Sequence, residues 1–197
     1  MKRELDEYLC TTYPKMFVNR HKSMQETCMC WGFECGDGWF QILNQLCMNI
    51  QHHIDWSIKN HERDQNYNKM VAEMQKGDFD YFDNVYASPI WSEDFKNQRR
   101  DEILKKGLCD FKGPCPQVTV DQVKEKFGTL RFYYTGGDDK VRGMVSMAES
   151  MSGVTCEECG NPGTTSIGGY IRTLCKEHGG TDFDTDEDDL LKQGFEQ

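Results

Sequence analysis

The spacing of apolar residues changes partway along the chain and separates a helical part from a part with strands. Residues 5–12 fit one short amphipathic helix, which a proline soon ends. Over residues 37–58 the apolar side chains recur at steps of three and four, which predicts the longest helix, with Asp37 as its N-cap. A second helix is predicted over residues 65–76, before a Gly-Asp pair breaks it.

The next segment carries aromatic residues and then clear helix signals. Residues 78–91 contain five aromatic residues and a proline, which predicts an irregular packed segment or a short strand. Ser92 has the side chain of an N-cap, acidic residues follow it, and two lysines precede Gly107. Because glycine supplies a left-handed stop, we predict a helix over residues 93–106.

From Gln117 onward the apolar residues alternate with polar ones, and β-branched and aromatic side chains are enriched. This pattern is typical of strands, and the corner at residues 127–129 turns one predicted strand back on the other. The sequence therefore predicts an antiparallel hairpin. Asp138 then caps a helix with one apolar face, which Gly153 closes.

The motif with the most specific chemistry follows that helix. Cys156 and Cys159 form a C-x2-C pair, Cys175 and His178 form a C-x2-H pair, and fifteen residues separate the two pairs. Thiolates and an imidazole at these spacings are the ligands of tetrahedral zinc. A Gly-Gly pair at residues 168–169 suits a two-residue hairpin turn, which would bring the two pairs together.

All four predicted ligands come from the protein, so this site has no coordination position for a substrate or a reactive water. We therefore expect a structural zinc ion that stabilises a ribbon-like module too short to bury a core of its own. The alternatives are a catalytic zinc ion and four residues that do not meet.

A polar stretch nearer the start of the chain holds a second group of cysteines, and a second metal site is an alternative for them. Its members are Cys28, Cys30 and Cys35. The candidates for a fourth ligand are His21, Cys109 and Cys115. Because this spacing matches no known type of metal site, the other interpretation is that the thiols are buried and pack around nearby aromatic side chains.

Two segments give a resemblance when they are combined with the zinc motif. The first is WGFECGDGW at residues 31–39, and the second is QVKEKFGTLRFYY at residues 122–134. In this order they resemble a family of uncharacterised bacteriophage and bacterial proteins, over about residues 14–178. The resemblance implies a phage-encoded or phage-related intracellular protein with the fold of that family, and it implies no particular activity.

Glu34 and Asp37 are candidates for the acid/base pair of a hydrolase, with His52 or His53 as a further group. The alternative is structural, with Asp37 as a helix cap and Glu34 paired with Arg131. The sequence has no nucleophile motif, no phosphate-binding P-loop and no dinucleotide fingerprint. These observations favour a protein without catalytic activity and leave the hydrolase as an alternative.

The predicted hairpin also carries candidates for binding a nucleotide or a single-stranded nucleic acid. The residues on the hairpin are Lys124, Lys126, Arg131 and Tyr133, and those on neighbouring elements are Arg142 and Arg172. Cationic groups beside an aromatic face hold bases and phosphates. The alternative is a solvated sheet face with cross-strand ion pairs to Glu125.

The net charge of -10 is concentrated at one end of the chain. Residues 179–197 hold seven acidic residues and one basic residue, so the remainder has 26 against 22, or -4. This balance argues against general binding to a phosphate backbone but excludes no local basic patch. The acidic end, with Leu190, Leu191 and Phe195, is either a docking segment for a basic partner or a disordered, solubilising tail.

The composition is that of a soluble globular protein, with 37% hydrophobic, 28% charged and 12% aromatic residues. No stretch approaches the roughly 20 apolar residues of a membrane span, so we expect no membrane partner. The charged residues 1–7 do not resemble a secretion signal. We therefore expect a cytoplasmic protein whose cysteines stay reduced, as metal ligands or buried thiols.

Together these patterns predict an α+β protein. Residues 1–152 form the core domain, with a helical N-terminal part and a small antiparallel hairpin sheet. A zinc-ribbon-like module at residues 153–180 packs on it, and residues 181–197 form an acidic tail. The leading hypothesis is a phage-encoded, non-enzymatic protein with a structural zinc ion that binds a host protein, in the host cytoplasm. The alternatives are a nucleotide or nucleic-acid binder and a hydrolase centred on Glu34 and Asp37.

Overall fold

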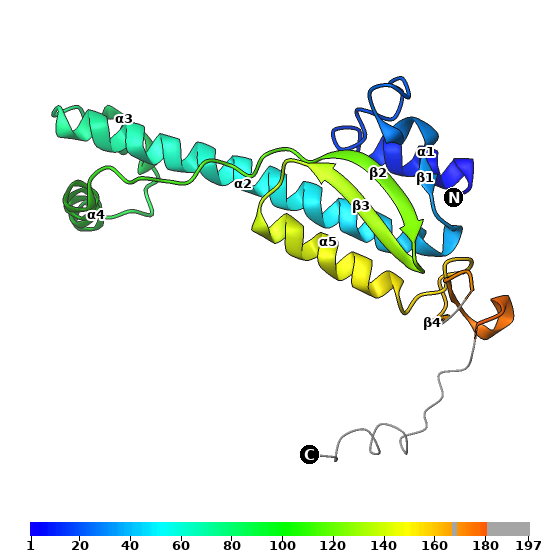
Figure 1. Cartoon of the computed structure of the whole chain (residues 1–197). Coiled ribbons are helices and arrows are strands. Elements are labelled where there is room, and N and C mark those ends of the chain that lie inside the picture. The colour runs from blue at the N-terminus through cyan, green and yellow to red at the C-terminus, as the bar shows by residue number, and fades with distance from the viewer. Residues whose placement is uncertain (167–168, 181–197) are drawn as a thin grey trace, which may run out of the picture. The chain divides into compact units, whose positions relative to one another are not determined.

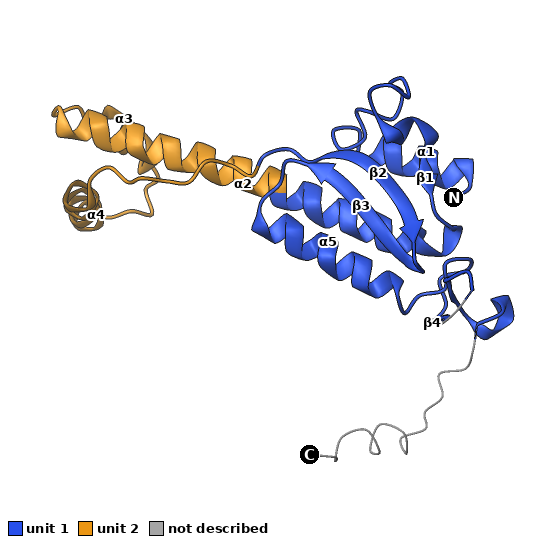
Figure 2. Ribbon diagram, in the orientation of Figure 1, with its two compact units in different colours: residues 1–53, 116–197 blue, residues 54–115 orange. Residues whose placement is uncertain are grey.

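Figure 1 shows the fold of the computed structural model, which describes residues 1–166 and 169–180. The chain divides into two compact units, which have different colours in Figure 2. Unit 1 comprises residues 1–53 and 116–197, and unit 2 comprises residues 54–115. The predicted core domain of residues 1–152 thus contains a unit that the apolar pattern did not indicate. The predicted boundary of the metal module at residue 153 stays a prediction.

The longest helix, α2 (Phe40–Gln75), contributes residues to both units. The prediction of two separate helices in this region is wrong. The polar stretch at residues 59–64 lacks an apolar face but contains no glycine or proline, so nothing breaks the helix there. The N-cap prediction for Asp37 is also wrong. Asp37 begins the 3₁₀ helix η2 (Asp37–Trp39), and its carboxylate accepts a 2.6 Å hydrogen bond from the backbone N–H of Lys2.

The sheet of unit 1 has three strands, β1 (Phe33–Glu34), β2 (Thr119–Lys126) and β3 (Thr129–Thr135). β2 and β3 form the predicted antiparallel hairpin. Its corner has Phe127 at φ +53° and Gly128 at φ +78°, as a tight hairpin turn requires. β1 pairs with β2 in parallel, so the sheet is mixed, and the predicted antiparallel hairpin sheet has a third, parallel strand that the sequence did not indicate.

Helix α5 (Asp139–Ser152) covers the free edge of β3. The backbone N–H of Leu130 donates to Ser152 Oγ at 2.8 Å, and that of Phe132 donates to Glu149 Oε1 at 3.0 Å. These bonds satisfy strand groups that would otherwise remain unpaired at a sheet edge. The predicted cap of this helix is confirmed, because Asp138 Oδ1 accepts the N–H groups of Lys140 and Val141. Buried apolar side chains of the sheet and of α2 and α5 form the core: Leu43, Ile50, Val120, Val123, Val141 and Val145.

Helix α1 (Arg3–Thr12) forms where the pattern predicts it and holds the cysteine-rich loop of residues 19–36. Asp6 is buried in α1, and its carboxylate accepts two hydrogen bonds from the Arg20 guanidinium, at 2.9 and 3.0 Å. Arg20 also donates to the carbonyl of Cys30 at 3.0 Å. The pair therefore fixes the position of the 3₁₀ helix η1 (Cys28–Trp31).

Unit 2 contains α3 (Asp80–Val85), α4 (Glu93–Lys106) and the C-terminal part of α2. Its core consists of Met70, Val71, Met74, Phe82 and Ile103. The prediction for α4 is confirmed, since Ser92 Oγ accepts from the Phe95 N–H and Gly107 ends the helix at φ +69°. The prediction of an irregular segment or strand over residues 78–91 missed α3.

The last described segment holds a second pair of strands. β4 (Thr164–Thr165) and β5 (Thr173–Leu174) pair antiparallel, and the 3₁₀ helix η3 (Lys176–His178) follows them. The chain therefore turns back between the two halves of the metal motif, as predicted. The predicted Gly168–Gly169 turn falls partly, and the predicted acidic tail wholly, outside the described residues.

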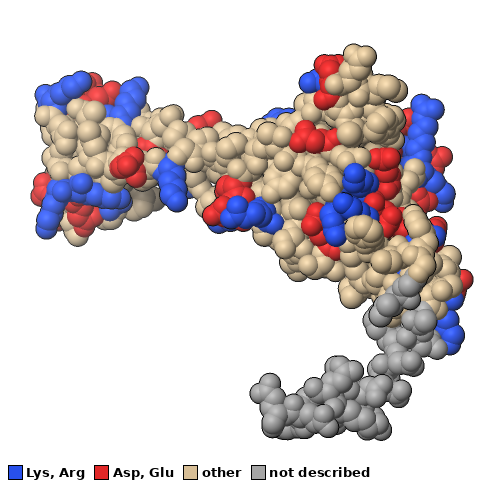
Figure 3. Space-filling view, viewed as in Figure 1, with Lys and Arg blue, Asp and Glu red and all other residues tan. Residues whose placement is uncertain are grey.

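On the face drawn in Figure 3, basic side chains lie among acidic ones rather than in one continuous stripe. Within the residues that the structure describes, no helix combines the length and the apolar character that crossing a membrane requires.

Candidate metal centre

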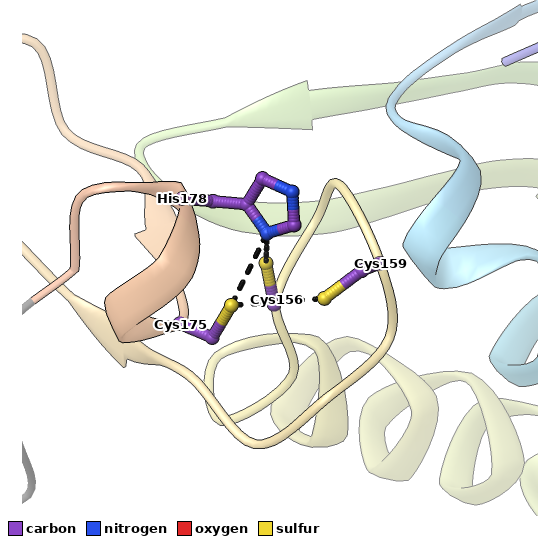
Figure 4. A group of neighbouring side chains, drawn as sticks. All are labelled: Cys156, Cys159, Cys175 and His178. Carbon is purple, nitrogen blue, oxygen red and sulfur yellow. Dashed lines mark hydrogen bonds between the residues drawn. The ribbon is translucent and has the colours of Figure 1, made fainter.

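Figure 4 shows that the four predicted metal ligands gather at one point. Their donor atoms all lie within 4.8 Å of one another. Cys156 Sγ is 3.7 Å from His178 Nδ1, and Cys159 Sγ is 3.7 Å from Cys175 Sγ. Cys175 Sγ is 3.2 Å from the same imidazole nitrogen. The fold thus brings both halves of the motif together, as the spacing predicts.

These distances fit the edges of a tetrahedron around one ion. Zinc binds thiolate sulfur at about 2.3 Å and imidazole nitrogen at about 2.0–2.1 Å, so neighbouring ligands lie roughly 3.5–3.8 Å apart. The distances of 3.7 Å match this range, and the distance of 3.2 Å is slightly short of it. The four side chains can therefore hold a metal ion with His178 Nδ1 as the nitrogen donor.

Two tight turns place the ligands. In the first, the Gly160 N–H donates to the carbonyl of Cys156 at 2.9 Å, and Gly160 has φ +81°. In the second, the N–H groups of His178 and Gly180 both donate to the carbonyl of Cys175, at 3.0 and 2.9 Å. Each turn folds the backbone so that ligands three positions apart face the same point. We call them the first and the second ligand turn.

The electrostatics around Cys156 favour a thiolate. Burial raises the pKa of the Cys156 thiol, but backbone N–H groups of Cys175, Cys159 and Glu158 together lower that pKa to about 7. The pKa of Cys159 lies higher, at about 11: the Asn161 N–H lowers it, but burial and the neighbouring thiols raise it more. Three thiolates at this spacing repel one another, and a divalent cation at their centre offsets that repulsion.

The first ligand turn is docked on the glycine-rich loop before α2. Trp39 Nε1 donates to the carbonyl of Thr155 at 2.8 Å, and the Gly38 N–H donates to the carbonyl of Glu157 at 2.8 Å. The buried Glu157 carboxylate accepts the Gly36 N–H at 2.9 Å. These contacts connect residues about 120 positions apart in the sequence.

There is no room for a side chain where this loop meets the turn. A Cβ atom on Gly36 would lie 2.2 Å from the carbonyl oxygen of Glu157, and one on Gly38 would lie 2.2 Å from that of Cys156. The hairpin corner makes a further contact, since Thr173 Oγ1 donates to the carbonyl of Gly128 at 2.6 Å. Residues 36–38, the hairpin corner and the metal motif therefore meet at one place.

Gly36, Gly38 and Glu157 support this centre although the sequence did not indicate them. The available signal was the Gly-x-Gly-Trp run at residues 36–39, since such closely spaced glycines often mark an approach of one backbone to another. Glu157 gave no signal of its own, because it stands between two ligands and looks like a spacer.

The second cysteine group is not brought together with metal ligands. Cys28 and Cys30 are half-buried and Cys35 is buried. The thiol of Cys30 donates to the carbonyl of Thr27 at 3.2 Å. Across residues 1–166 and 169–180, no close group of three or more metal-binding side chains contains any of these cysteines. His21 is exposed on the surface.

Part of the predicted basic and aromatic group does gather on the hairpin. Lys124 Nζ lies 5.4 Å from the ring centre of Tyr133, and Lys126 Nζ lies 5.5 Å from that of Phe127. Lys124 is directly opposite Arg131 in the strand register. The other two candidates are engaged elsewhere: Arg142 pairs with Asp139 at 2.9 Å, and Arg172 pairs with Glu157 at 3.1 Å and with Glu158.

The predicted hydrolase pair has separate partners. Glu34 accepts a hydrogen bond from Gln122 Nε2 at 3.0 Å, while the Arg131 guanidinium donates to Thr129 Oγ1 and to a carbonyl of its own strand. Asp37 forms an ion pair with Lys2 at 3.0 Å. His53 Nε2 lies 2.8 Å from Asp138, and His52 is exposed.

Comparison of the chain with protein-family models, with curated proteins and with solved structures gave no match.

Proposed function

We propose that this protein is a non-enzymatic binding protein in which Cys156, Cys159, Cys175 and His178 hold one structural zinc ion. The observation that carries this proposal is the closed donor set. Four side chains of the protein converge at tetrahedral distances, so all coordination positions of a four-coordinate ion have protein ligands. Thiolate and imidazole donors in this geometry favour zinc over magnesium, calcium or manganese.

The ion would act as a cross-link in a zinc-ribbon-like module of residues 153–180. Its described strands have two residues each, which is too little sheet to fold alone. Structural zinc ions contribute about 10–16 kcal/mol of binding free energy at pH 7 in small modules, and that energy stabilises the fold. With the ion bound, the module would also hold the loop before α2 in place, through the contacts of Glu157 and Trp39.

We further propose that the binding partner is a host protein and that the chain is phage-encoded. The support for this setting is the resemblance of residues 31–39 and 122–134 to the bacteriophage and bacterial family. The partner class is supported by exposed tryptophans, since tryptophan is enriched at protein interfaces. Trp31 is 57% exposed and Trp56 is 54% exposed.

The test of a structural ion uses the purified full chain with cobalt in place of zinc. We expect a tetrahedral cobalt spectrum that added azide or imidazole does not change. A spectrum that shifts with these ligands would show an open position and would contradict the proposal.

The test of the partner is affinity purification from phage-infected cells. We expect one host protein in a fixed stoichiometry with the zinc-loaded chain. Because Trp31 is the exposed candidate contact, Trp31→Ala should reduce the yield of that host protein, while the matched surface change Lys22→Ala should not. Turnover of a captured small molecule would contradict the proposal.

A second candidate function, binding of a nucleotide or single-stranded nucleic acid, rests on the hairpin. Tyr133 is 42% exposed, with the Lys124 ammonium over its ring and Arg131 across the strand pair. Such a stacking surface holds a base and an adjacent phosphate. Binding to an oligonucleotide that weakens steeply with salt, and that Tyr133→Ala abolishes, would favour this function over the first.

A further inference from the structure

A groove with apolar walls runs between α2 and α5 in unit 1, the cyan and yellow helices of Figure 1. Its first part has a volume of about 480 Å³. The apolar residues that line it are Ile42, Leu46, Met144, Met147, Ala148 and Met151. The other lining residues have neutral amide side chains, so a charged ligand finds no counter-charge inside this part.

The groove continues to the metal centre. A second hollow of about 460 Å³ shares Gln41, Ile42 and Met151 with the first. It extends to Cys159, Gly160 and Asn161, which belong to the first ligand turn. We call both parts together the α2–α5 groove.

Two of the three methionines that line this groove are open to solvent. Met147 is 66% exposed and Met151 is 45% exposed. Methionine side chains adapt to apolar groups of different shapes, and an exposed patch of this kind marks a binding surface. The groove therefore has the chemistry to hold aliphatic and aromatic side chains of a peptide segment.

The chain itself supplies a segment that starts beside this groove. Cys159 is part of the groove wall, and its Sγ lies 3.7 Å from Cys175 Sγ. The N–H of Gly180 donates to the carbonyl of Cys175, so Gly180 lies close to this wall. Residues 181–197 follow directly. An extended chain covers about 3.3–3.6 Å per residue, and the helical rise from Met151 to Met144 is only about 10 Å, so this segment is long enough to reach along the groove.

The composition of that segment matches the groove. Its large apolar residues are Phe183, Leu190, Leu191 and Phe195. Leu191 and Phe195 are four positions apart, the spacing that places two side chains on one face of a helical turn. The segment is also acidic, and exposed Lys140 continues the stripe of Met144, Met147 and Met151 along α5, where it offers a counter-charge at the far end.

We propose that residues 181–197 dock in the α2–α5 groove of the same chain, with Leu190, Leu191 and Phe195 against the methionines of α5. The docked segment shields the apolar wall of the α2–α5 groove from contact with other proteins. This inference depends neither on the identity of the metal nor on that of the partner.

The test measures how fast hydrogen peroxide converts individual methionines of the full chain to the sulfoxide, by mass spectrometry of the digested protein. Met24 is the internal control, because its 69% exposure matches the 66% of Met147. With the segment docked, Met147 should react several-fold more slowly than Met24. In the full-length variant Leu190→Ser, Leu191→Ser, Phe195→Ser, Met147 should react at the rate of Met24, which itself stays unchanged.

A matched variant with Lys192→Ser and Gln193→Ser should keep the protection of Met147, because only polar side chains of the same segment change. Equal rates for Met147 and Met24 in the unchanged protein would overturn the proposal. Protection that increases with protein concentration would place the segment of a second copy in the groove and would overturn it as well. The metal content of each variant is measured alongside, so a failure of the fold is recognised separately from a failure of docking.

Discussion

Unit 1 contains two cysteine-rich segments with opposite outcomes. In the segment of residues 156–178, three thiols and one imidazole have donor atoms within 4.8 Å of one another. In the loop of residues 19–36, the three cysteines join no such group with any residue that the structure describes, and an ion pair between Asp6 and Arg20 fixes the loop instead. The number of thiols is the same in both segments, so the number of thiols does not decide whether a metal site forms.

The backbone between the cysteines makes the difference. Cys156 and Cys159 are joined by a tight turn that Gly160 completes with φ +81°, so both sulfurs face one point. Cys28 and Cys30 lie two positions apart in η1, and side chains at this spacing on a helical turn do not face each other. A C-x-C pair in a helical turn therefore holds its thiols apart, whereas a C-x2-C pair in a glycine turn brings them together.

The largest expected effect comes from replacing one cysteine in each of the two segments. Cys159→Ala should lose its zinc and unfold the metal module, because a structural zinc ion supplies about 10 kcal/mol or more to a module of this size. Cys30→Ala should keep one zinc ion per chain. Elemental analysis of the purified variants measures both, and one zinc ion per chain in Cys159→Ala would refute the assignment.

A smaller effect is expected from the loop on which the first ligand turn docks. Gly38→Ala places a Cβ 2.2 Å from the carbonyl oxygen of Cys156, and backbone atoms cannot move aside as a flexible side chain does. We expect the free energy of unfolding to fall by about 3 kcal/mol. The control is Gly143→Ala in α5, where an added Cβ would meet nothing within 4 Å. This change should raise the free energy of unfolding by about 0.5–1 kcal/mol. Urea denaturation compares the two, and equal stabilities would show that the contact at Gly38 is unimportant.

The smallest of these effects concerns the loop without a metal site. Asp6→Asn removes the charge that Arg20 contacts twice, which should cost about 2 kcal/mol of unfolding free energy. The exposed pair of Arg3 and Glu7 is the control, and Glu7→Gln should change stability by less than about 0.5 kcal/mol. Zinc content should stay at one ion per chain in both variants. Zinc loss in Asp6→Asn would mean that the two cysteine-rich segments are coupled after all.

The parts of the fold that depend on neighbouring residues were predictable from the sequence. The caps at Ser92 and Asp138 form hydrogen bonds within three residues, and both helices form where their caps predict them. The hairpin corner at residues 127–129 and the four gathered metal ligands follow from short-range turns in the same way.

The parts that depend on distant residues were not predictable. β1 has two residues and pairs with β2 about 90 positions later, so no periodic pattern marks it. Asp37 has the right side chain for a cap, but the backbone and ammonium of Lys2 compete for its carboxylate. Likewise Gly36 and Gly38 acquire their role only when the first ligand turn lies against them.

The contact between Trp39 and Thr155 gives the protein an intrinsic optical reporter. Of the four tryptophans, Trp39 is fully buried, while Trp31, Trp56 and Trp91 are 57%, 54% and 37% exposed. The Trp39 indole donates its N–H to the carbonyl of Thr155, the residue directly before the first metal ligand, so its surroundings change when the first ligand turn leaves the loop. A buried indole emits at shorter wavelength than the three solvent-exposed ones, so the blue edge of the fluorescence emission comes from Trp39. Without any label, this edge therefore reports whether the metal module is docked.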